Sequence, residues 1–141
     1  MSVESGGTGF LCGYLGGEPL LTTVKIANNG TSLTTSAALI DTGANGYLFV
    51  SKKFASRLRK TLFLKEFTAF EPAAVSGHDR KNPQMITAAL QGHLTIQNRT
   101  IRNEWMIEIN TIHDVIVGRK WFDFHDVMVD CRRRRLVYPV E

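Results

Sequence analysis

The chain alternates apolar and polar side chains over most of its length from residue 20 onward, which is the period of half-buried β-strands. Asn28-Asn29-Gly30 is a strong turn signal that joins the first two runs into a hairpin. Two longer runs flank the polar segment SGHDRKNP and predict a long hairpin with an exposed tip. The predicted strands cover residues 20–27, 31–40, 47–50, 64–75, 85–96, 100–109, 115–117, 127–129 and 136–138.

Two segments follow a helical period instead. Residues 51–60 are the clearest helix candidate, because Ser51 can act as the N-cap and basic residues occupy the face opposite the apolar one. The apolar positions at helical spacing are Phe54, Ala55, Leu58 and Leu62. Residues 119–125 predict a second, shorter helix. We therefore expect a mostly β domain with one or two short helices.

The two tryptophans are interpreted as core or interface residues without a ligand role. Trp105 shares a spacing of two, or a multiple of two, with Ile101, Ile107 and Ile109, which predicts a common apolar face on that strand. Trp121 falls in the predicted second helix.

Length and composition indicate one domain of ordinary size. The chain has 141 residues and a mass of 15.8 kDa, with 43% hydrophobic and 21% charged residues. Residues 1–17 are rich in glycine and are interpreted as a linker or extension, with residues 18–141 as a single domain. We find no apolar stretch of membrane length and no secretory signal. Cys12 and Cys131 are then interpreted as reduced thiols, and a cytoplasmic location is expected.

The sequence gives no indication of a metal or an organic cofactor. The four histidines share no ligand spacing, and the glycine-rich start precedes no strand–helix unit that could cradle a phosphate. Neither kind of cofactor is therefore expected.

A modest positive charge permits a polyanionic partner without requiring one. Seventeen Lys and Arg stand against thirteen Asp and Glu, a formal net charge of +4. Four consecutive arginines, Arg132, Arg133, Arg134 and Arg135, fall inside a predicted hairpin with no aromatic residue interleaved. A solvated β-turn is favoured over a specific nucleic-acid site, and a basic nucleic-acid-binding β-domain remains a rival function.

One acid stands where an apolar strand enters a glycine-containing turn. In ALIDTGANG, strand alternation places Leu39 and Asp41 on the same face, so the carboxylate lies at the end of an apolar surface. An isolated Asp-Thr-Gly is most often only a turn in which the Asp caps the backbone. The rest of the chain is needed to decide between these interpretations.

The segment ALIDTGANGYLFV resembles the active-site segment of aspartic proteases, and VIVGR followed by KWF resembles the second signature of retropepsins. Between them lies an apparent flap hairpin with VSGH at its tip. The run ITAALQGHLTIQNRTIRNEWMIE and the closing VMVDCRRRRLVYP resemble proteases of Ty3/gypsy-type LTR retrotransposons. The resemblance covers residues 20–139. It implies an all-β, mainly antiparallel closed barrel that forms a C2 homodimer.

The resemblance also implies roles for individual residues. Asp41 would be catalytic, Thr42 would join the two active-site loops through hydroxyl–backbone bonds, and Gly43 would let the substrate backbone approach. Further implied contacts are Ala44 and Asn45 with the substrate main chain, Gly118 and Arg119 as a brace, and Ser76, Gly77 and His78 at the flap tip. The family often has Asp at the position of Asn45, paired with the Arg matched by Arg119.

Three apolar residues are candidates for substrate side-chain pockets. Leu39, Leu48 and Ile116 follow from strand alternation together with the resemblance. The alternative for each is an ordinary place in the core, which is the commoner situation of Leu and Ile in β proteins. His78 has a similar alternative, a solvated turn residue.

The chemistry implied by the resemblance requires two carboxylates that share one proton. One acts as the base for a water that attacks the peptide carbonyl, while the other protonates the carbonyl oxygen. The chain has a single Asp-Thr-Gly, so a second copy must supply the other Asp41, and a two-fold axis places identical residues face to face. Cleavage is expected to be favoured at mildly acidic pH, where the shared-proton state is populated.

The function implied is an aspartic endopeptidase that cleaves extended peptides and processes a retrotransposon polyprotein. Its expected setting is the cytoplasm, virus-like particles included. The main rival is a catalytically silent module of a domesticated retroelement gene, which keeps the fold for dimerisation or peptide binding. Cleavage of a peptide discriminates between the two.

Overall fold

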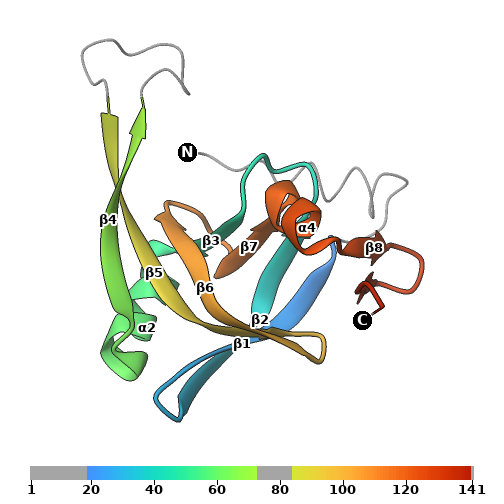
Figure 1. Cartoon of the computed structure of the whole chain (residues 1–141), viewed down its shortest axis with the longest axis horizontal. Coiled ribbons are helices and arrows are strands. Elements are labelled where there is room, and N and C mark those ends of the chain that lie inside the picture. Colours follow the sequence, from blue (N-terminus) through green and yellow to red (C-terminus); the bar gives the residue numbers. More distant parts are fainter. Residues whose placement is uncertain (1–18, 73–83, 141) are drawn as a thin grey trace.

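The computed structural model describes residues 19–72 and 84–140 and shows strands wrapped into a barrel, with two helices on opposite sides (Figure 1). The elements are β1 Leu21–Asn28, β2 Thr31–Asp41, β3 Leu48–Ser51, α2 Lys52–Leu62, β4 Lys65–Pro72, β5 Gln84–Ile96, β6 Arg99–Ile109, β7 Val115–Gly118, α4 Arg119–His125, β8 Met128–Asp130 and β9 Arg135–Val137. Each predicted strand and helix is confirmed, with ends that move by a few residues. The segment 1–17 and the flap tip at Ser76, Gly77 and His78 lie outside the described residues.

The barrel closes because the first and fifth strands meet. The main sheet has the order β1-β2-β7-β3-β6-β5-β4, and β1 also pairs antiparallel with β5, from Val24 opposite Ile96 to Ala27 opposite His93. Six strands thus form a closed barrel, and β4 pairs with the part of β5 that projects beyond it. This arrangement confirms the predicted mainly antiparallel closed barrel.

Two parallel pairings bring the distant halves of the chain together. β2 runs parallel to β7, with Leu39 opposite Ile116 and Asp41 opposite Gly118. β3 runs parallel to β6 and antiparallel to β7. The central strand β7 therefore places the second sequence signature directly beside the Asp-Thr-Gly turn.

Alternate residues of these strands serve two apolar clusters. The larger one, the main core, includes Ile40, Val50 and Val117 and also receives Trp121, which has no exposed surface. A smaller cluster is formed by the residues in between. Its members are Leu39, Ala44, Phe49, Ile109 and Ile116, with Ile107 packed against them. Because side chains of a strand alternate, the smaller cluster lies on the face that also carries Asp41.

Helix α2 begins as its sequence predicts. The backbone N–H of Phe54 donates to the Oγ of Ser51 at 3.0 Å, which is an N-cap bond. Phe63 ends the helix in the left-handed conformation, with φ of 53°. The helix buries the predicted apolar face, Phe54, Ala55, Leu58 and Leu62, in the main core.

An irregularity interrupts the pairing of β5 with β6. Gly92 lies opposite Glu104, whereas Leu94 lies opposite Ile101, so β6 carries one residue more than β5 between these pairs. Asn103, inside the irregular stretch, has φ of 55°, a conformation that Asn tolerates better than most residues. This β-bulge reverses which residues of β6 face the barrel interior.

Trp105 is predicted as a core or interface residue, and the bulge excludes the core. Glu104 and Met106 are buried, while Trp105 is 38% exposed and lies edge-on to Phe67 of β4, with ring centroids 4.7 Å apart. Simple alternation from Ile101 would place Trp105 inward, and the extra residue of β6 turns it outward. Trp121, in contrast, is a core residue as predicted.

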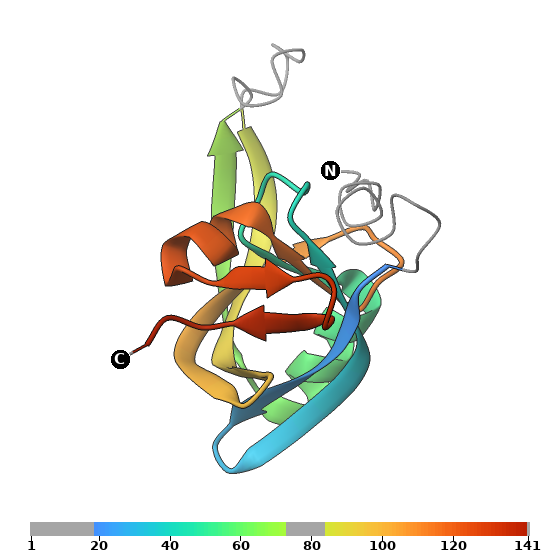
Figure 2. The ribbon, with the colours of Figure 1, turned by 90° about the vertical axis from the view of Figure 1, so that its right-hand side faces the viewer.

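Three of the four arginines, Arg132, Arg133 and Arg134, lie in a turn, and Arg135 begins β9. β8 and β9 form an antiparallel hairpin, seen as the red strands in Figure 2. The backbone N–H of Arg133 donates to Asp130 at 3.0 Å, and its guanidinium lies 3.2 Å from the same carboxylate. These bonds lower the pKa of Asp130, the backbone bond most. The predicted turn is confirmed.

Among the described residues no helix has the length and apolar character that crossing a bilayer requires.

Candidate active site

Asp41 is the last residue of β2, and the loop of residues 42–47 follows it to β3. The carboxyl is fully buried, and its Oδ1 accepts a hydrogen bond from the backbone N–H of Gly43 at 3.2 Å. The backbone oxygen of Asp41 accepts from the N–H of Ala44 at 3.0 Å. Asp41 therefore does cap its own turn, as the simpler interpretation of the sequence requires.

Two polar atoms of this turn have no partner within the described residues. They are the second carboxyl oxygen of Asp41, Oδ2, and the hydroxyl Oγ1 of Thr42, and both are buried. A buried polar group without a hydrogen bond costs roughly 1–3 kcal/mol, and a charged one costs more. Such a cost on two successive side chains marks the turn as a place where a further contact is missing from the single chain.

Helix α4 holds the loop through its first backbone amides. The N–H groups of Gly118, Arg119 and Lys120 donate to the carbonyl oxygens of Tyr47, Ala44 and Gly46. All three bonds are 2.9 Å long. The amides at a helix start have no partner within the helix, so the loop carbonyls satisfy them while the helix fixes the loop.

Gly118 lies so close to the backbone of the loop that this packing requires glycine there. A Cβ built on it would overlap the carbonyl group of Gly46 and would lie 3.2 Å from the backbone oxygen of Ala44. Because the opposing atoms are backbone, they cannot move aside as a flexible side chain would. The Gly of the second signature is thus needed for the close approach of strand β7 to the loop.

The side chain of Arg119 adds a weaker contact at the surface. Its Nη2 donates to the Oδ1 of Asn45 at 3.1 Å, and the pair is exposed to solvent. A carboxamide carries no charge, so this bond lacks the electrostatic component of an Arg–carboxylate pair. Loop and helix are therefore held mainly by backbone bonds.

The predicted pocket residues fall into two groups. Leu39 and Ile116 are fully buried and belong to the smaller apolar cluster, on the face of Asp41. Leu48 is fully buried in the main core, on the opposite side of its strand. This placement corrects the prediction for Leu48, which is a core residue because the alternation of β3 turns Phe49, not Leu48, toward the smaller cluster.

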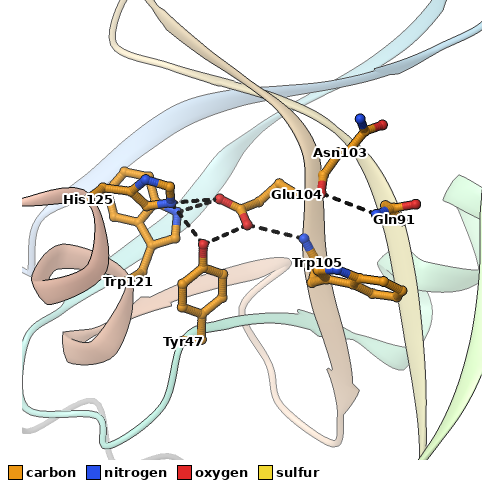
Figure 3. Close-up of polar contacts among 7 residues, drawn as sticks. All are labelled: Tyr47, Gln91, Asn103, Glu104, Trp105, Trp121 and His125. Atoms are coloured by element: carbon orange, nitrogen blue, oxygen red, sulfur yellow. Dashed lines mark hydrogen bonds and ion pairs between the residues drawn. The ribbon is translucent and has the colours of Figure 1, made fainter.

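A second buried carboxylate, Glu104, lies at the other end of the same loop (Figure 3). Its Oε1 accepts from the Tyr47 hydroxyl at 2.7 Å and from the Trp105 backbone N–H at 3.1 Å. Its Oε2 accepts from the Trp121 indole at 3.0 Å and lies 2.9 Å from Nε2 of His125. We call Glu104, Tyr47, Trp121 and His125 the Glu104 network.

The network keeps Tyr47 neutral. Burial raises the pKa of the Tyr47 hydroxyl far above its ordinary value, and the hydrogen bond to Glu104 and the charge of Glu104 act in the same direction. The hydroxyl therefore retains its proton and acts as a donor to the carboxylate.

The sequence contained no signal for this network. Glu104 follows Asn103 in a strand whose apolar pattern predicts an outward position for it, and only the bulge turns it inward. The other members come from the loop and from α4, far from Glu104 in sequence. Among the described residues, no group of three or more His, Cys, Asp or Glu is arranged to hold a metal ion.

Comparison with known proteins yields one family and one fold. The profile of a family described as the PEG10/RTL1 protease domain matches residues 37–139. A search of curated proteins finds no match. Among solved structures, the retroviral protease-like domain of Ddi1 from Leishmania major is similar with a TM-score of 0.55 and 16% sequence identity, over 86% of this chain and 90% of that chain. At this identity the structural likeness establishes the fold alone, and it confirms the predicted retropepsin-like class.

Proposed function

The chain belongs to the PEG10/RTL1 protease domain family, and on that premise we propose that it is an aspartic endopeptidase that becomes complete as a C2 homodimer. Each copy would contribute one Asp41, and extended peptides would be its substrates. The proposal extends to processing of a retroelement polyprotein in the cytoplasm.

The observation that carries the proposal is the unsatisfied turn. Asp41 Oδ2 and Thr42 Oγ1 are buried without a partner in the described part of the single chain, although Asp41 Oδ1 is bonded to Gly43. A two-fold axis beside the turn would give each of these atoms a partner from the same turn of the second copy. The two orphaned atoms are thus explained by one contact, which also creates the pair of acids.

The reaction follows from that pairing. Two carboxylates a hydrogen bond apart cannot both ionise readily, so the pair holds one proton between them. The ionised member takes a proton from a water that attacks the peptide carbonyl, and the protonated member donates to the carbonyl oxygen. The newly protonated member then donates its proton to the amine as the C–N bond breaks. The other member takes the proton of one hydroxyl of the tetrahedral intermediate as the carbonyl re-forms, so the pair again holds one proton.

The residues around Asp41 support binding of an extended peptide. Gly43 is exposed next to the buried carboxyl, so a substrate backbone can approach there without a side chain in the way. Leu39 and Ile116 lie on the face of Asp41 and remain the proposed floor of the side-chain pockets. Ala44 and Asn45 keep their proposed main-chain contacts, and Ser76, Gly77 and His78 their proposed flap role.

A catalytically silent dimerisation or peptide-binding module is the second candidate. The observation that favours it is the Arg119–Asn45 bond, which is exposed and lacks a carboxylate. Such a brace holds the site less firmly than an ion pair would. Both candidates require a dimer, and only the first requires turnover.

The test mixes two versions of the chain. Wild-type protein is expected to have a mass of about 32 kDa in solution, twice the 15.8 kDa of one chain. An excess of about tenfold of Asp41→Asn chains should place most wild-type chains in mixed dimers with one acid, and cleavage should fall to about a tenth.

The matched control is Asp126→Asn, which changes an exposed acid whose φ of 55° suits Asn equally well. An excess of this variant should not inhibit. Wild-type cleavage that survives excess Asp41→Asn would refute the shared site, and a dimer without any cleavage would establish the silent module.

A further inference from the structure

We propose that Glu104 is a positioning residue for this active site, because its buried carboxylate fixes the loop that follows Asp41 against helix α4. The inference rests on the proposed function for its effect on catalysis. Its effect on the loop can be measured without any cleavage.

Both oxygens of the carboxylate have partners. Oε1 accepts from the Tyr47 hydroxyl and the Trp105 backbone, and Oε2 accepts from the Trp121 indole and lies 2.9 Å from His125 Nε2 (Figure 3). Groups from the loop, from β6 and from α4 thus converge on one carboxylate.

His125 contacts two other members of the network with one ring nitrogen. Its Nε2 lies 2.9 Å from Glu104 Oε2 and 2.8 Å from the Tyr47 hydroxyl oxygen. The imidazole therefore links the carboxylate to the tyrosine in either of its tautomers.

The network closes a ring of contacts through the loop. The backbone oxygen of Tyr47 accepts from Gly118 at the start of α4, while its hydroxyl reaches Glu104. Glu104 in turn binds Trp121 and His125 on the same helix. Tyr47 is therefore fixed at both its backbone and its side chain, and the loop between Asp41 and Tyr47 has an anchor at each end.

Stability alone does not explain a carboxylate at this place. Glu104 is 4% exposed, and burying an ionised group costs several kcal/mol even when partners are present. Well-packed apolar replacements of such groups are often neutral or stabilising. The carboxylate instead fixes the orientation of three side chains. An apolar group could pack against a hydroxyl, an indole and an imidazole, but it could not orient them through hydrogen bonds.

The test removes one hydroxyl and compares it with a matched one. Tyr47→Phe deletes the bond to Glu104 while the carboxylate keeps its contacts with Trp105, Trp121 and His125, so the fold is retained. Tyr138→Phe is the control, because the Tyr138 hydroxyl also donates a 2.7 Å bond, to the backbone oxygen of Ile96, in a region away from the loop. Both variants are compared with wild type in cleavage, dimer dissociation and amide hydrogen exchange.

In cleavage, Tyr47→Phe should lower kcat about tenfold and leave KM within about twofold, since Tyr47 is not among the proposed substrate-binding residues. The dimer dissociation constant should not change. Tyr138→Phe should retain the kcat of wild type. Equal kcat in the two variants, or a loss confined to KM, would overturn the positioning role.

In hydrogen exchange, the amides of Gly118, Arg119 and Lys120 report on the loop because they donate to its carbonyls. Tyr47→Phe should speed their exchange about tenfold, and Tyr138→Phe should not. Glu104→Gln should act in the same direction as Tyr47→Phe, since an amide can accept at only one of its two polar atoms.

The two readouts separate failure of the inference from failure of the proposed function. If wild-type protein cleaves nothing, the proposed function fails, and the exchange rates still decide whether Glu104 holds the loop. If wild-type protein is active and the exchange rates of the two Tyr variants agree, Glu104 is not a positioning residue.

Discussion

Two buried carboxylates lie at the two ends of one loop, and they differ in how well a single chain satisfies them. Both oxygens of Glu104 have partners: Tyr47, Trp105 and Trp121 donate to them, and His125 Nε2 lies 2.9 Å from Oε2. Asp41 has one bonded oxygen and one that is buried without a partner in the described residues. The difference separates an acid that the fold itself completes from an acid that the described part of the single chain leaves incomplete.

The contrast follows from where each acid lies. Glu104 is surrounded by α4, the loop and its own strand, all from the same chain. Asp41 ends β2 at a turn whose neighbouring hydroxyl, on Thr42, is also unsatisfied. A group that is satisfied within one chain holds position, and a group that is unsatisfied remains available for binding and chemistry.

The largest expected effect comes from removing the charge of Asp41, the acid with the unpartnered oxygen. Asp41→Asn should lower cleavage by a factor of about 10² to 10⁴ or more, because the acid–base pair is lost. Its amide oxygen can still accept from Gly43, and a buried charge disappears, so the free energy of unfolding should stay equal or rise. A peptide-cleavage assay checks the predicted loss of activity, and urea denaturation checks the predicted free energy of unfolding. A marked loss of stability would contradict the view that the Asp41 carboxylate is incompletely hydrogen-bonded in the described part of the single chain.

Gly118→Ala should disturb the close approach of β7 to the loop of residues 42–47. The added methyl group meets the backbone of Gly46, and we expect a loss of about 1–3 kcal/mol in the free energy of unfolding together with loss of cleavage. Gly30→Ala is the control: φ there is +79° with open space around it, so stability should fall while cleavage persists. Retained cleavage in Gly118→Ala would show that the loop tolerates displacement.

Asn45→Asp should strengthen the surface brace by a smaller amount. A carboxylate at 45 would form an ion pair with Arg119, and an exposed pair contributes about 0–1 kcal/mol. Urea denaturation at low and high salt measures the gain, which should shrink as salt rises. The double variant with Arg119→Ala should show no gain; an equal gain there would exclude the ion pair as its cause.

The smallest expected effect concerns Tyr138, the control for Tyr47. Burial raises the pKa of Tyr138 to about 12. Its folded-state pKa lies above the unfolded value near 10, so its contribution to stability is complete below pH 10 and is lost as the pH rises toward 12. Denaturation between pH 9 and pH 12 should show a steeper loss for wild type than for Tyr138→Phe. Parallel curves would show that Tyr138 titrates as an ordinary tyrosine.

Much of the fold could be predicted because its signals are local. The alternation of the strands, the Asn28-Asn29-Gly30 turn and the Ser51 N-cap each act within a few residues, and each is found as predicted. The short helix at Arg119–His125 is found with the bounds expected. Local signals fail where one extra residue changes the face of a strand, as the bulge near Asn103 does for Trp105.

Some residues of the candidate site could likewise be predicted from local sequence, and others could not. Asp41 could be found from its motif, and the β2–β7 register places Gly118 opposite it. Leu48 could not be separated from Leu39 by composition, since both are Leu in apolar strands. Their faces became clear only from the pairing of β3 with β7 and β6.

The sequence by itself determined the strands, the turns, the two helices and the acid of the Asp-Thr-Gly turn, because these depend on neighbours within a few positions along the chain. Only the tertiary structure decided that Glu104 is buried among Tyr47, Trp121 and His125, and that Asp41 and Thr42 each have a buried atom without a partner among residues 19–72 and 84–140. Whether a polar atom is satisfied depends on residues brought together by strand register and barrel closure, over separations along the chain that no local pattern encodes.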